Sequence, residues 1–231
     1  MNMTGLFIFL GTLALSLWAT WRVKRVYNHF KTIPASSGIT GAEAAARILD
    51  RAGIHDVEIV AHNEMLGDHY DPMHKRLVLS NDNYYGTSLA ALGVSAHECG
   101  HAIQHNIAYA PLKWRMLAVG ATTYASQIVM WLPLIGLFTG LIHTYTGLMI
   151  MAIAWGVIML FNLITLPVEF DASRRAKAIL GGMGFIREGE EAYGVRKTLD
   201  AAGWTYVAAF VTSLAYFLWY LLPLLTGRSD E

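Results

Sequence analysis

Three long runs without formal charge dominate the pattern of hydrophobic and polar positions. They cover residues 4–21, 116–168 and 204–226. A membrane-spanning helix needs about 20 mostly apolar residues. The middle run is too long for one span and suits two, with turn-forming residues at positions 139–147 between them. We therefore predict four transmembrane helices, over residues 4–21, 116–138, 146–166 and 204–224.

In residues 22–115 the hydrophobic and polar positions alternate over short segments, as in a small soluble domain. We predict a helix over residues 41–52, because Thr40 and Glu43 can form a capping box at its start. Gly53 is suited to end this helix, since glycine readily adopts the left-handed backbone conformation found there.

Two short segments of this domain alternate as strands do, at residues 57–60 and 76–80, and we expect them to pair. A helical pattern returns at Thr87 and ends near Asn106. The segment over residues 22–115 is therefore predicted to be an α+β domain. Residues 167–203 are predicted to form a second polar segment that is helical.

Basic residues near the span ends predict the orientation, because short cytoplasmic loops carry an excess of Lys and Arg. The loop between the second and third spans has neither, and only Arg228 follows the fourth. The other ends of the four predicted spans are flanked by basic residues, namely Arg22, Lys24, Arg25, Lys31, Lys113, Arg115, Arg174, Arg175, Lys177, Arg196 and Lys197. We expect both termini outside and residues 22–115 and 167–203 on the cytoplasmic side.

The composition agrees with a membrane protein. Of 231 residues 55% are hydrophobic, and the mean hydropathy is +0.39, which is more apolar than a typical soluble domain. Seventeen basic and seventeen acidic residues balance, so net charge does not favour nucleic acid as a partner. Cys99 is the single cysteine, so an intramolecular disulfide is excluded.

A His-Glu-x-x-His motif lies in the predicted helix that ends near Asn106. Residues four apart share one face of a helix, so His97 and His101 can present two imidazole nitrogens to one metal ion. Glu98 lies beside them and can act as a general base on a water molecule. This arrangement is typical of zinc hydrolases. The alternative is a polar helix turn with two ordinary histidines.

A catalytic zinc ion usually has three protein ligands, so a third is required. His105 lies eight residues from His97, about 12 Å along the helix axis, which is too far for one metal. We interpret His105 as a group that orients a ligand or faces the substrate, or as an ordinary surface histidine. Glu169 is the better candidate, because the predicted hairpin of two spans returns it to the side of the motif.

Other polar residues near the two segments have supporting roles in this interpretation. Asp171 and Ser173 are candidates for orienting an imidazole ligand. Alternatively, Glu169 and Asp171 are interfacial charges that pair with the arginines at 174 and 175. Cys99 points to a different side of the helix from the histidines, and we interpret it as a packing residue.

Four stretches carry a family resemblance: Tyr70-Asp71-Pro72, Leu77–Ser80, Ser95–His105 and Leu166–Ser173. They resemble the YugP-type family of bacterial membrane zinc metallopeptidases, and more distantly HtpX-like gluzincins. The resemblance implies a zinc peptidase of the bacterial plasma membrane and supports Glu169 as a ligand. In the gluzincins an Asp follows the ligand Glu by four residues, whereas this chain has Ser173 there and Asp171 two residues after Glu169.

The combined prediction is a mainly α membrane protein with four transmembrane helices and a small cytoplasmic α+β, zincin-like metallopeptidase domain. We expect zinc as the cofactor, the lipid bilayer as a partner and a peptide or membrane protein as the substrate, cut near the cytoplasmic membrane surface. The alternative is a non-catalytic zinc-binding membrane scaffold or an ion transporter. Gly136 and Gly140 form a G-x-x-x-G pair suited to helix packing, which leaves an oligomer open.

Two details of substrate binding are expected. An extended peptide could add to an edge strand at residues 76–80, or this strand could belong to a purely structural hairpin. An oxyanion partner is also required, and the sequence leaves four candidates: Tyr84, Tyr85, His105 and Tyr193.

Overall fold

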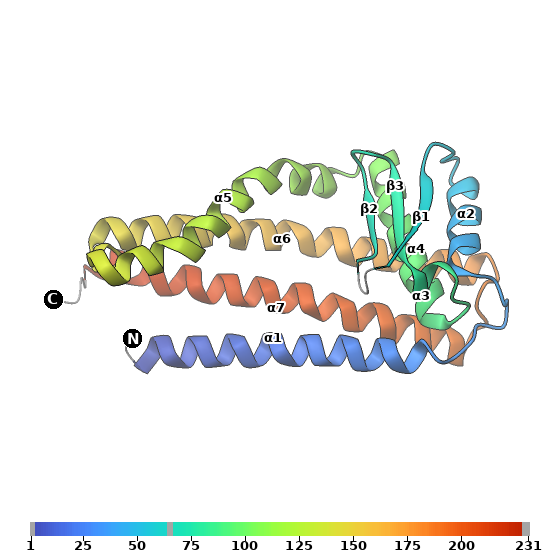
Figure 1. Cartoon of the computed structure of the whole chain (residues 1–231), viewed down its shortest axis with the longest axis horizontal. Coiled ribbons are helices and arrows are strands. Elements are labelled where there is room, and N and C mark those ends of the chain that lie inside the picture. The colour runs from blue at the N-terminus through green and yellow to red at the C-terminus, as the bar shows by residue number, and fades with distance from the viewer. Residues whose placement is uncertain (1–2, 64–66, 228–231) are drawn as a thin grey trace. The chain divides into compact units, whose positions relative to one another are not determined.

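The computed structural model of this chain describes residues 3–63 and 67–227 and is mainly helical (Figure 1). The helices are α1 (Met3–Phe30), α2 (Gly41–Arg51), α3 (Asn81–Tyr84), α4 (Leu89–Asn106), α5 (Ala110–Thr139), α6 (Tyr145–Gly182) and α7 (Glu190–Thr226), with a short 3-10 turn at Leu141–His143. The strands are β1 (Glu58–His62), β2 (His69–Asp71) and β3 (Arg76–Ser80). Predicted helices at 41–52 and 87–106 are confirmed as α2 and α4.

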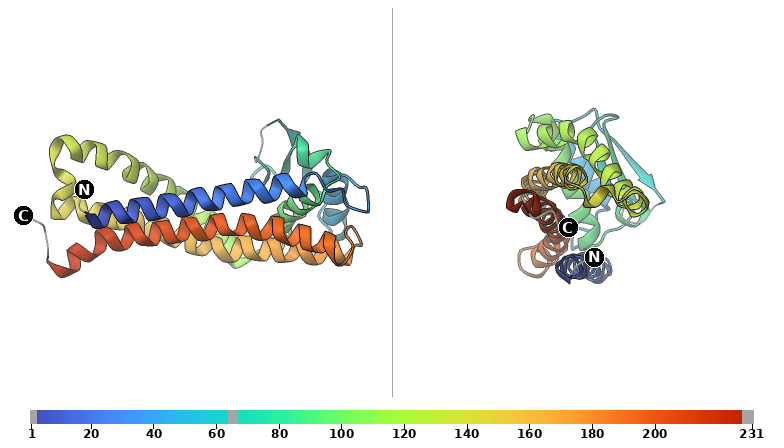
Figure 2. Two further views of the ribbon diagram at one scale, coloured as in Figure 1. Left: turned by 90° about the horizontal axis from the view of Figure 1, so that it is seen from below. Right: turned by 90° about the vertical axis from the view of Figure 1, so that its left-hand side faces the viewer.

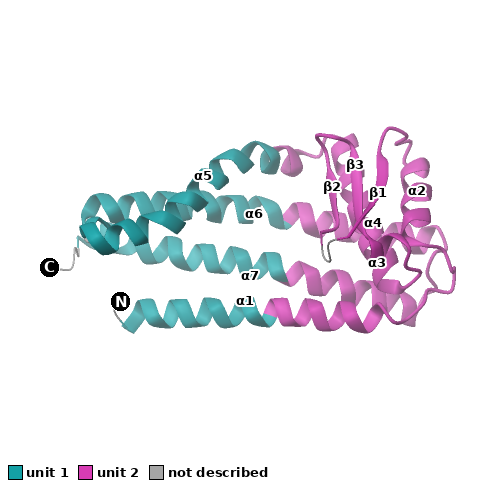
Figure 3. Ribbon diagram, in the orientation of Figure 1, with its two compact units in different colours: residues 1–18, 114–166, 205–231 teal, residues 19–113, 167–204 magenta. Residues whose placement is uncertain are grey.

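The chain divides into two compact units (Figure 3). Unit 1 comprises the described parts of residues 1–18, 114–166 and 205–231, and unit 2 comprises those of residues 19–113 and 167–204. Four helices, α1, α5, α6 and α7, are long and apolar enough to cross a membrane. Each of them contains one of the four predicted spans.

Inside unit 1, α6 and α7 pack through one polar contact and one aromatic contact. The Asn162 side chain donates to the Ala209 carbonyl at 3.2 Å and to Ser213 Oγ at 3.0 Å. The rings of Trp155 and Tyr216 stack at 4.5 Å between centroids. The Asn162 amide, which lies within the third predicted span, therefore serves helix packing.

The α5–α6 turn explains the two glycines that were predicted to form a packing face. Gly140 ends α5 with a left-handed backbone, at φ 71°. A Cβ on Gly136 would fall 2.8 Å from the Ile142 side chain. Because Gly140 lies outside the helix and Gly136 contacts the turn, the prediction of a shared helix-packing face is wrong.

Helix α6 is continuous through Pro167, so the third predicted span and the start of the polar segment predicted from residue 167 form one helix. Proline removes one backbone hydrogen bond from a helix. The remaining hydrogen bonds of the 38-residue helix continue on both sides. Glu169 is therefore held in the interior of a long helix and not in the first turn of a short one.

Unit 2 contains a three-stranded sheet in the order β1-β3-β2. The expected pairing of β1 with β3 is confirmed and is parallel, and β2 pairs with β3 antiparallel. Because β3 is the central strand, the prediction that residues 76–80 form an edge for the substrate is wrong. Strand β2 was missed because His69-Tyr70-Asp71 is short and has no apolar alternation.

The core of unit 2 lies between the sheet, α2 and α4. Leu77 and Leu79 of β3 are fully buried, as are Leu92 and Cys99 of α4. The capping box at Thr40 is present, and Gly53 adopts φ 69° after α2, both as predicted.

The adjoining parts of α1, α6 and α7 in unit 2 run side by side in Figure 3 and in the left view of Figure 2. Gly194 permits one close approach, because a Cβ there would fall within 2.9 Å of Phe30 and of Leu89. The motif helix α4 is thus fixed by helices from both ends of the chain.

Candidate metal centre

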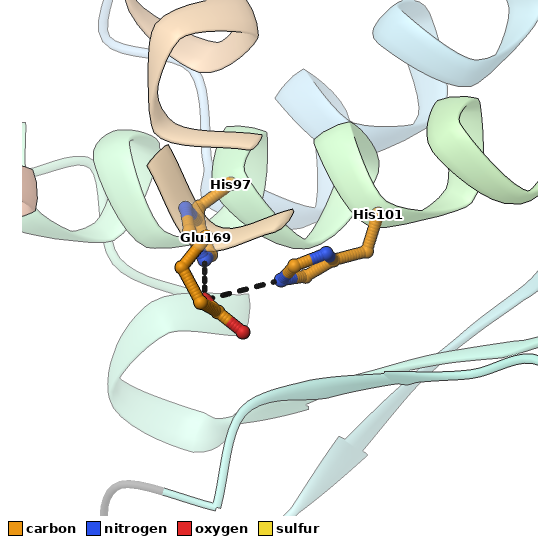
Figure 4. A group of neighbouring side chains, drawn as sticks. All are labelled: His97, His101 and Glu169. Carbon is orange, nitrogen blue, oxygen red and sulfur yellow. Dashed lines mark hydrogen bonds and ion pairs between the residues drawn. The ribbon is translucent and has the colours of Figure 1, made fainter. Parts of the chain in front are cut away.

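The structure brings together the three residues predicted as metal ligands, all within unit 2 (Figure 4). His97 Nε2 lies 3.2 Å and His101 Nε2 3.5 Å from the same oxygen, Glu169 Oε2. One ligand atom from each residue lies within 4.8 Å of the other two. Glu169 is buried, with 2% of its surface exposed. Two adjacent turns of α4 and the middle of α6 therefore converge on one point.

Gly100 allows α6 to approach the motif helix closely. A Cβ at this position would fall 2.9 Å from the Ala172 carbonyl oxygen, one turn after Glu169. Real side chains do not tolerate such a contact with backbone. The glycine of the motif is therefore the local reason that Glu169 can reach the two histidines.

The Nδ1 atoms of both imidazoles, which are not the atoms that face Glu169, have hydrogen-bond partners of their own. His97 Nδ1 lies 3.1 Å from Ser173 Oγ, and His101 Nδ1 lies 3.0 Å from Gln104 Oε1. Such partners fix ring orientation and direct the other nitrogen to a metal. The donor set of two Nε2 atoms and one carboxylate oxygen fits zinc. Ser173 was predicted in this role, whereas Gln104 was missed because a lone glutamine carries no motif.

Asp171 supports the site indirectly. Its Oδ2 accepts hydrogen bonds from Gln104 at 3.0 Å and from Arg175 Nε at 2.6 Å, and its Oδ1 accepts from Arg174. The structure thus combines the two alternatives that the sequence left open for Asp171. It pairs with both arginines and also holds the residue that contacts His101.

Glu98 is buried beside the two histidines and is anchored by Tyr70, for which no such role was predicted from the sequence. Its Oε2 accepts a hydrogen bond from the Tyr70 backbone N–H at 3.0 Å, with 7% of the residue exposed. Within the described residues Oε1 has no hydrogen-bond partner. Strand β2 therefore holds one carboxylate oxygen and leaves the other available to a water molecule.

His105 lies beside Tyr70 and is not part of the ligand cluster among the described residues. The Tyr70 hydroxyl lies 2.9 Å from His105 Nδ1. Burial, followed by the charges of Asp56 and Asp71, raises the pKa of the Tyr70 phenol, which stays protonated at neutral pH. Glu98 and His105 are seven residues apart, so they share the helix face that Tyr70 covers.

The remaining candidates for an oxyanion partner have other contacts. The rings of Tyr84 and Tyr85 pack against each other, with centroids 4.7 Å apart. Tyr193 lies under the cations of Arg196 and Lys197, at 5.7 and 5.2 Å. Of the four predicted residues, only His105 is joined to the strand that contacts Glu98.

The electrostatic environment favours a cation between the histidines. Burial alone would lower the pKa of His101, but hydrogen bonding to Glu169 and the charges of Glu98 and Glu169 outweigh it and raise the pKa. The same negative charges stabilise a divalent metal ion. Burial and Glu98 raise the pKa of the Cys99 thiol, which is fully buried and directed at the Ala45 carbonyl. Cys99 is thus a packing residue, as predicted.

Comparisons with known proteins agree with this chemistry. Residues 5–225 match the family described as "Putative neutral zinc metallopeptidase". A relative from Bacillus subtilis (strain 168), named "Putative membrane protease YugP", is 44% identical over 228 residues, which cover 98% of this chain and 100% of the relative. No solved structure matches.

Proposed function

The chain belongs to the putative neutral zinc metallopeptidase family, and on that premise we propose that it is a membrane-bound, zinc-dependent endopeptidase of the gluzincin type. His97, His101 and Glu169 would hold the zinc ion. The observation that carries this proposal is that the three donor atoms converge on one point. Both Nε2 atoms face Glu169 Oε2, while both Nδ1 atoms have other partners.

A zinc ion bound there would supply Lewis acidity to the scissile carbonyl and lower the pKa of a water molecule. The chain's own residues supply the proton transfer. Glu98 takes a proton from the attacking water at its Oε1 and delivers it to the leaving amine, while the Tyr70 N–H holds Oε2 in place. Anchoring one oxygen fixes the direction of the base, which reduces the reorganisation needed during the reaction.

An extended peptide is the substrate class that the sheet supports. Peptides often add to the edge of a sheet. Strand β2 is an edge strand of the described sheet, and its residue Tyr70 contacts the proposed base. The substrate would therefore lie along β2, which replaces β3 in the role expected from the sequence.

The charge pattern supports cleavage near the cytoplasmic membrane surface. Lys and Arg gather at the ends of the predicted spans that lead into residues 22–115 and 167–203, which contain every residue of the proposed site. Glu169 follows the uncharged run directly. We propose that both termini lie outside and that membrane proteins are cut close to the bilayer.

The proposed base provides the test. Glu98→Gln in the purified full-length chain should retain zinc and lose cleavage of casein and of membrane-protein substrates by at least about 100-fold, the range typical of a general base. Glu188→Gln is the matched control, because Glu188 is an exposed carboxylate outside the site.

The same variants separate the enzyme from a zinc-binding scaffold or a transporter. Cleavage at the wild-type rate by Glu98→Gln would exclude the proposed mechanism. A wild-type chain that binds zinc and cleaves nothing would favour the scaffold. Zinc retained at full stoichiometry in Glu169→Ala would exclude Glu169 as the third ligand.

A further inference from the structure

Gln104 forms three hydrogen bonds beside the candidate metal centre, and none of its surface is exposed. Its amide nitrogen donates to the Val168 carbonyl at 2.8 Å and to Asp171 Oδ2 at 3.0 Å. Its amide oxygen lies 3.0 Å from His101 Nδ1. One side chain therefore joins a predicted ligand on α4 to the turn of α6 that contains Glu169.

These partners determine which way the amide faces. The Val168 carbonyl and the Asp171 carboxylate are both acceptors, so only the NH2 group of Gln104 can bond to them. The amide oxygen must then face His101, and it can only accept. His101 consequently donates a proton from Nδ1 to Gln104, and Nε2 is the nitrogen left to bind a metal ion held together with Glu169.

We propose that Gln104 is a positioning residue for the zinc site, which sets the tautomer and ring orientation of His101 and ties them to the Glu169 segment. This inference rests on the proposed zinc site and extends it to a residue outside the ligand motif. Partners that orient a ligand imidazole typically contribute 10- to 100-fold in metal affinity.

The test compares the two glutamines of the chain by the same substitution. Gln104→Met has a similar length and shape but cannot form any of the three hydrogen bonds. Gln127→Met is the matched control, because Gln127 is exposed on α5 and accepts a hydrogen bond from Trp131 only. Zinc affinity is measured on the full chain in detergent micelles by competition with a chromophoric chelator.

We expect zinc affinity to fall about 10- to 100-fold in Gln104→Met and to stay unchanged in Gln127→Met. The absorption spectrum of added cobalt(II), a probe of ligand geometry, should also change in Gln104→Met. A purely structural role would lower the melting temperature of the metal-free protein and leave both the affinity and the spectrum as in the wild type. That result would overturn the proposal.

Gln104→Asn keeps the experiment decisive if the methionine variant does not fold. Its amide is one methylene shorter, so it cannot reach His101 while it keeps its hydrogen bonds to the Val168 carbonyl and to Asp171. Zinc affinity equal to the wild type in Gln104→Asn would then overturn the proposal.

The outcomes also separate this inference from the proposed activity. Suppose that the wild type binds zinc but cleaves no peptide, and that Gln104→Met has a lower zinc affinity. This result would support the positioning role and contradict the peptidase. Wild-type affinity in Gln104→Met, in a chain that cleaves peptides, would contradict only the positioning role. A wild-type chain that binds no zinc would overturn both.

Discussion

Glu98 and Cys99 are neighbours on α4 that differ in chemistry because they face different surroundings. Glu98 lies on the side covered by β2, where Tyr70 holds one of its oxygens. Cys99 lies in the core, with none of its surface exposed, against the Ala45 backbone. A reactive thiol needs access and a lowered pKa. Cys99 has neither, although it is the motif residue that is chemically most reactive when free.

The thiol of Cys99 should therefore resist alkylation in the folded protein. We expect it to remain unmodified by a water-soluble maleimide at neutral pH over a period that fully labels the denatured chain, because burial excludes the reagent and keeps the thiol protonated. Mass spectrometry of the intact protein measures the extent of labelling. Rapid labelling of the folded, metal-free protein would contradict the packing role.

Contact between α4 and α6 is the element-scale feature on which the site depends. Gly100 faces the Ala172 backbone at a distance that leaves no room for a Cβ. The two helices can therefore cross closely enough for Glu169 to reach His97 and His101. Small residues at such crossings determine the spacing of the helix backbones.

Gly100→Ala should separate the two helices at this crossing. We expect a loss of about 1–3 kcal/mol in stability, typical of an overpacked core position, together with weaker zinc binding because Glu169 moves with α6. Gly182→Ala is a suitable control, since a Cβ there meets nothing within 4 Å. Equal zinc affinity in Gly100→Ala and the wild type would contradict the role of this glycine. Zinc titration with thermal unfolding measures both quantities.

The sequence predicts those parts of the site that follow from helical spacing and charge. His97 and His101 follow from their four-residue separation, and Glu169 from a carboxylate next to a long uncharged run. The role of Tyr70 could not be predicted, because it contacts Glu98 from 28 residues away along the chain, and the link from Gln104 to α6 spans 64 residues. The central position of β3 in the sheet could likewise not be predicted, because it depends on pairing with the three-residue strand β2.

At the scale of the whole molecule, the ligands come from separate parts of the chain. Only folding brings α4 and α6 together at the site, so a metal ion bound to all three ligands would stabilise the folded state and not the unfolded one. Above its dissociation constant, the metal should therefore contribute to stability in proportion to the logarithm of its free concentration.

Removal of zinc should lower the melting temperature of the wild-type chain. Zinc at about 100 times its dissociation constant contributes about 2.7 kcal/mol, which a chelator would remove. Differential scanning fluorimetry in micelles with and without chelator measures the shift, and His97→Ala should show little shift because it lacks a ligand. A melting temperature that does not respond to zinc in the wild type would contradict a site formed by folding.

The continuity of α6 has a rotational consequence. Each residue of an α-helix advances the direction of its side chains by about 100°. Ala176, which is fully buried in the core, and Glu169, which faces the histidines, are carried by one uninterrupted helix. They are seven residues apart, close to two full turns, so they project from nearly the same angle of the helix. A turn of α6 about its axis therefore cannot keep the contacts of one residue while it changes those of the other.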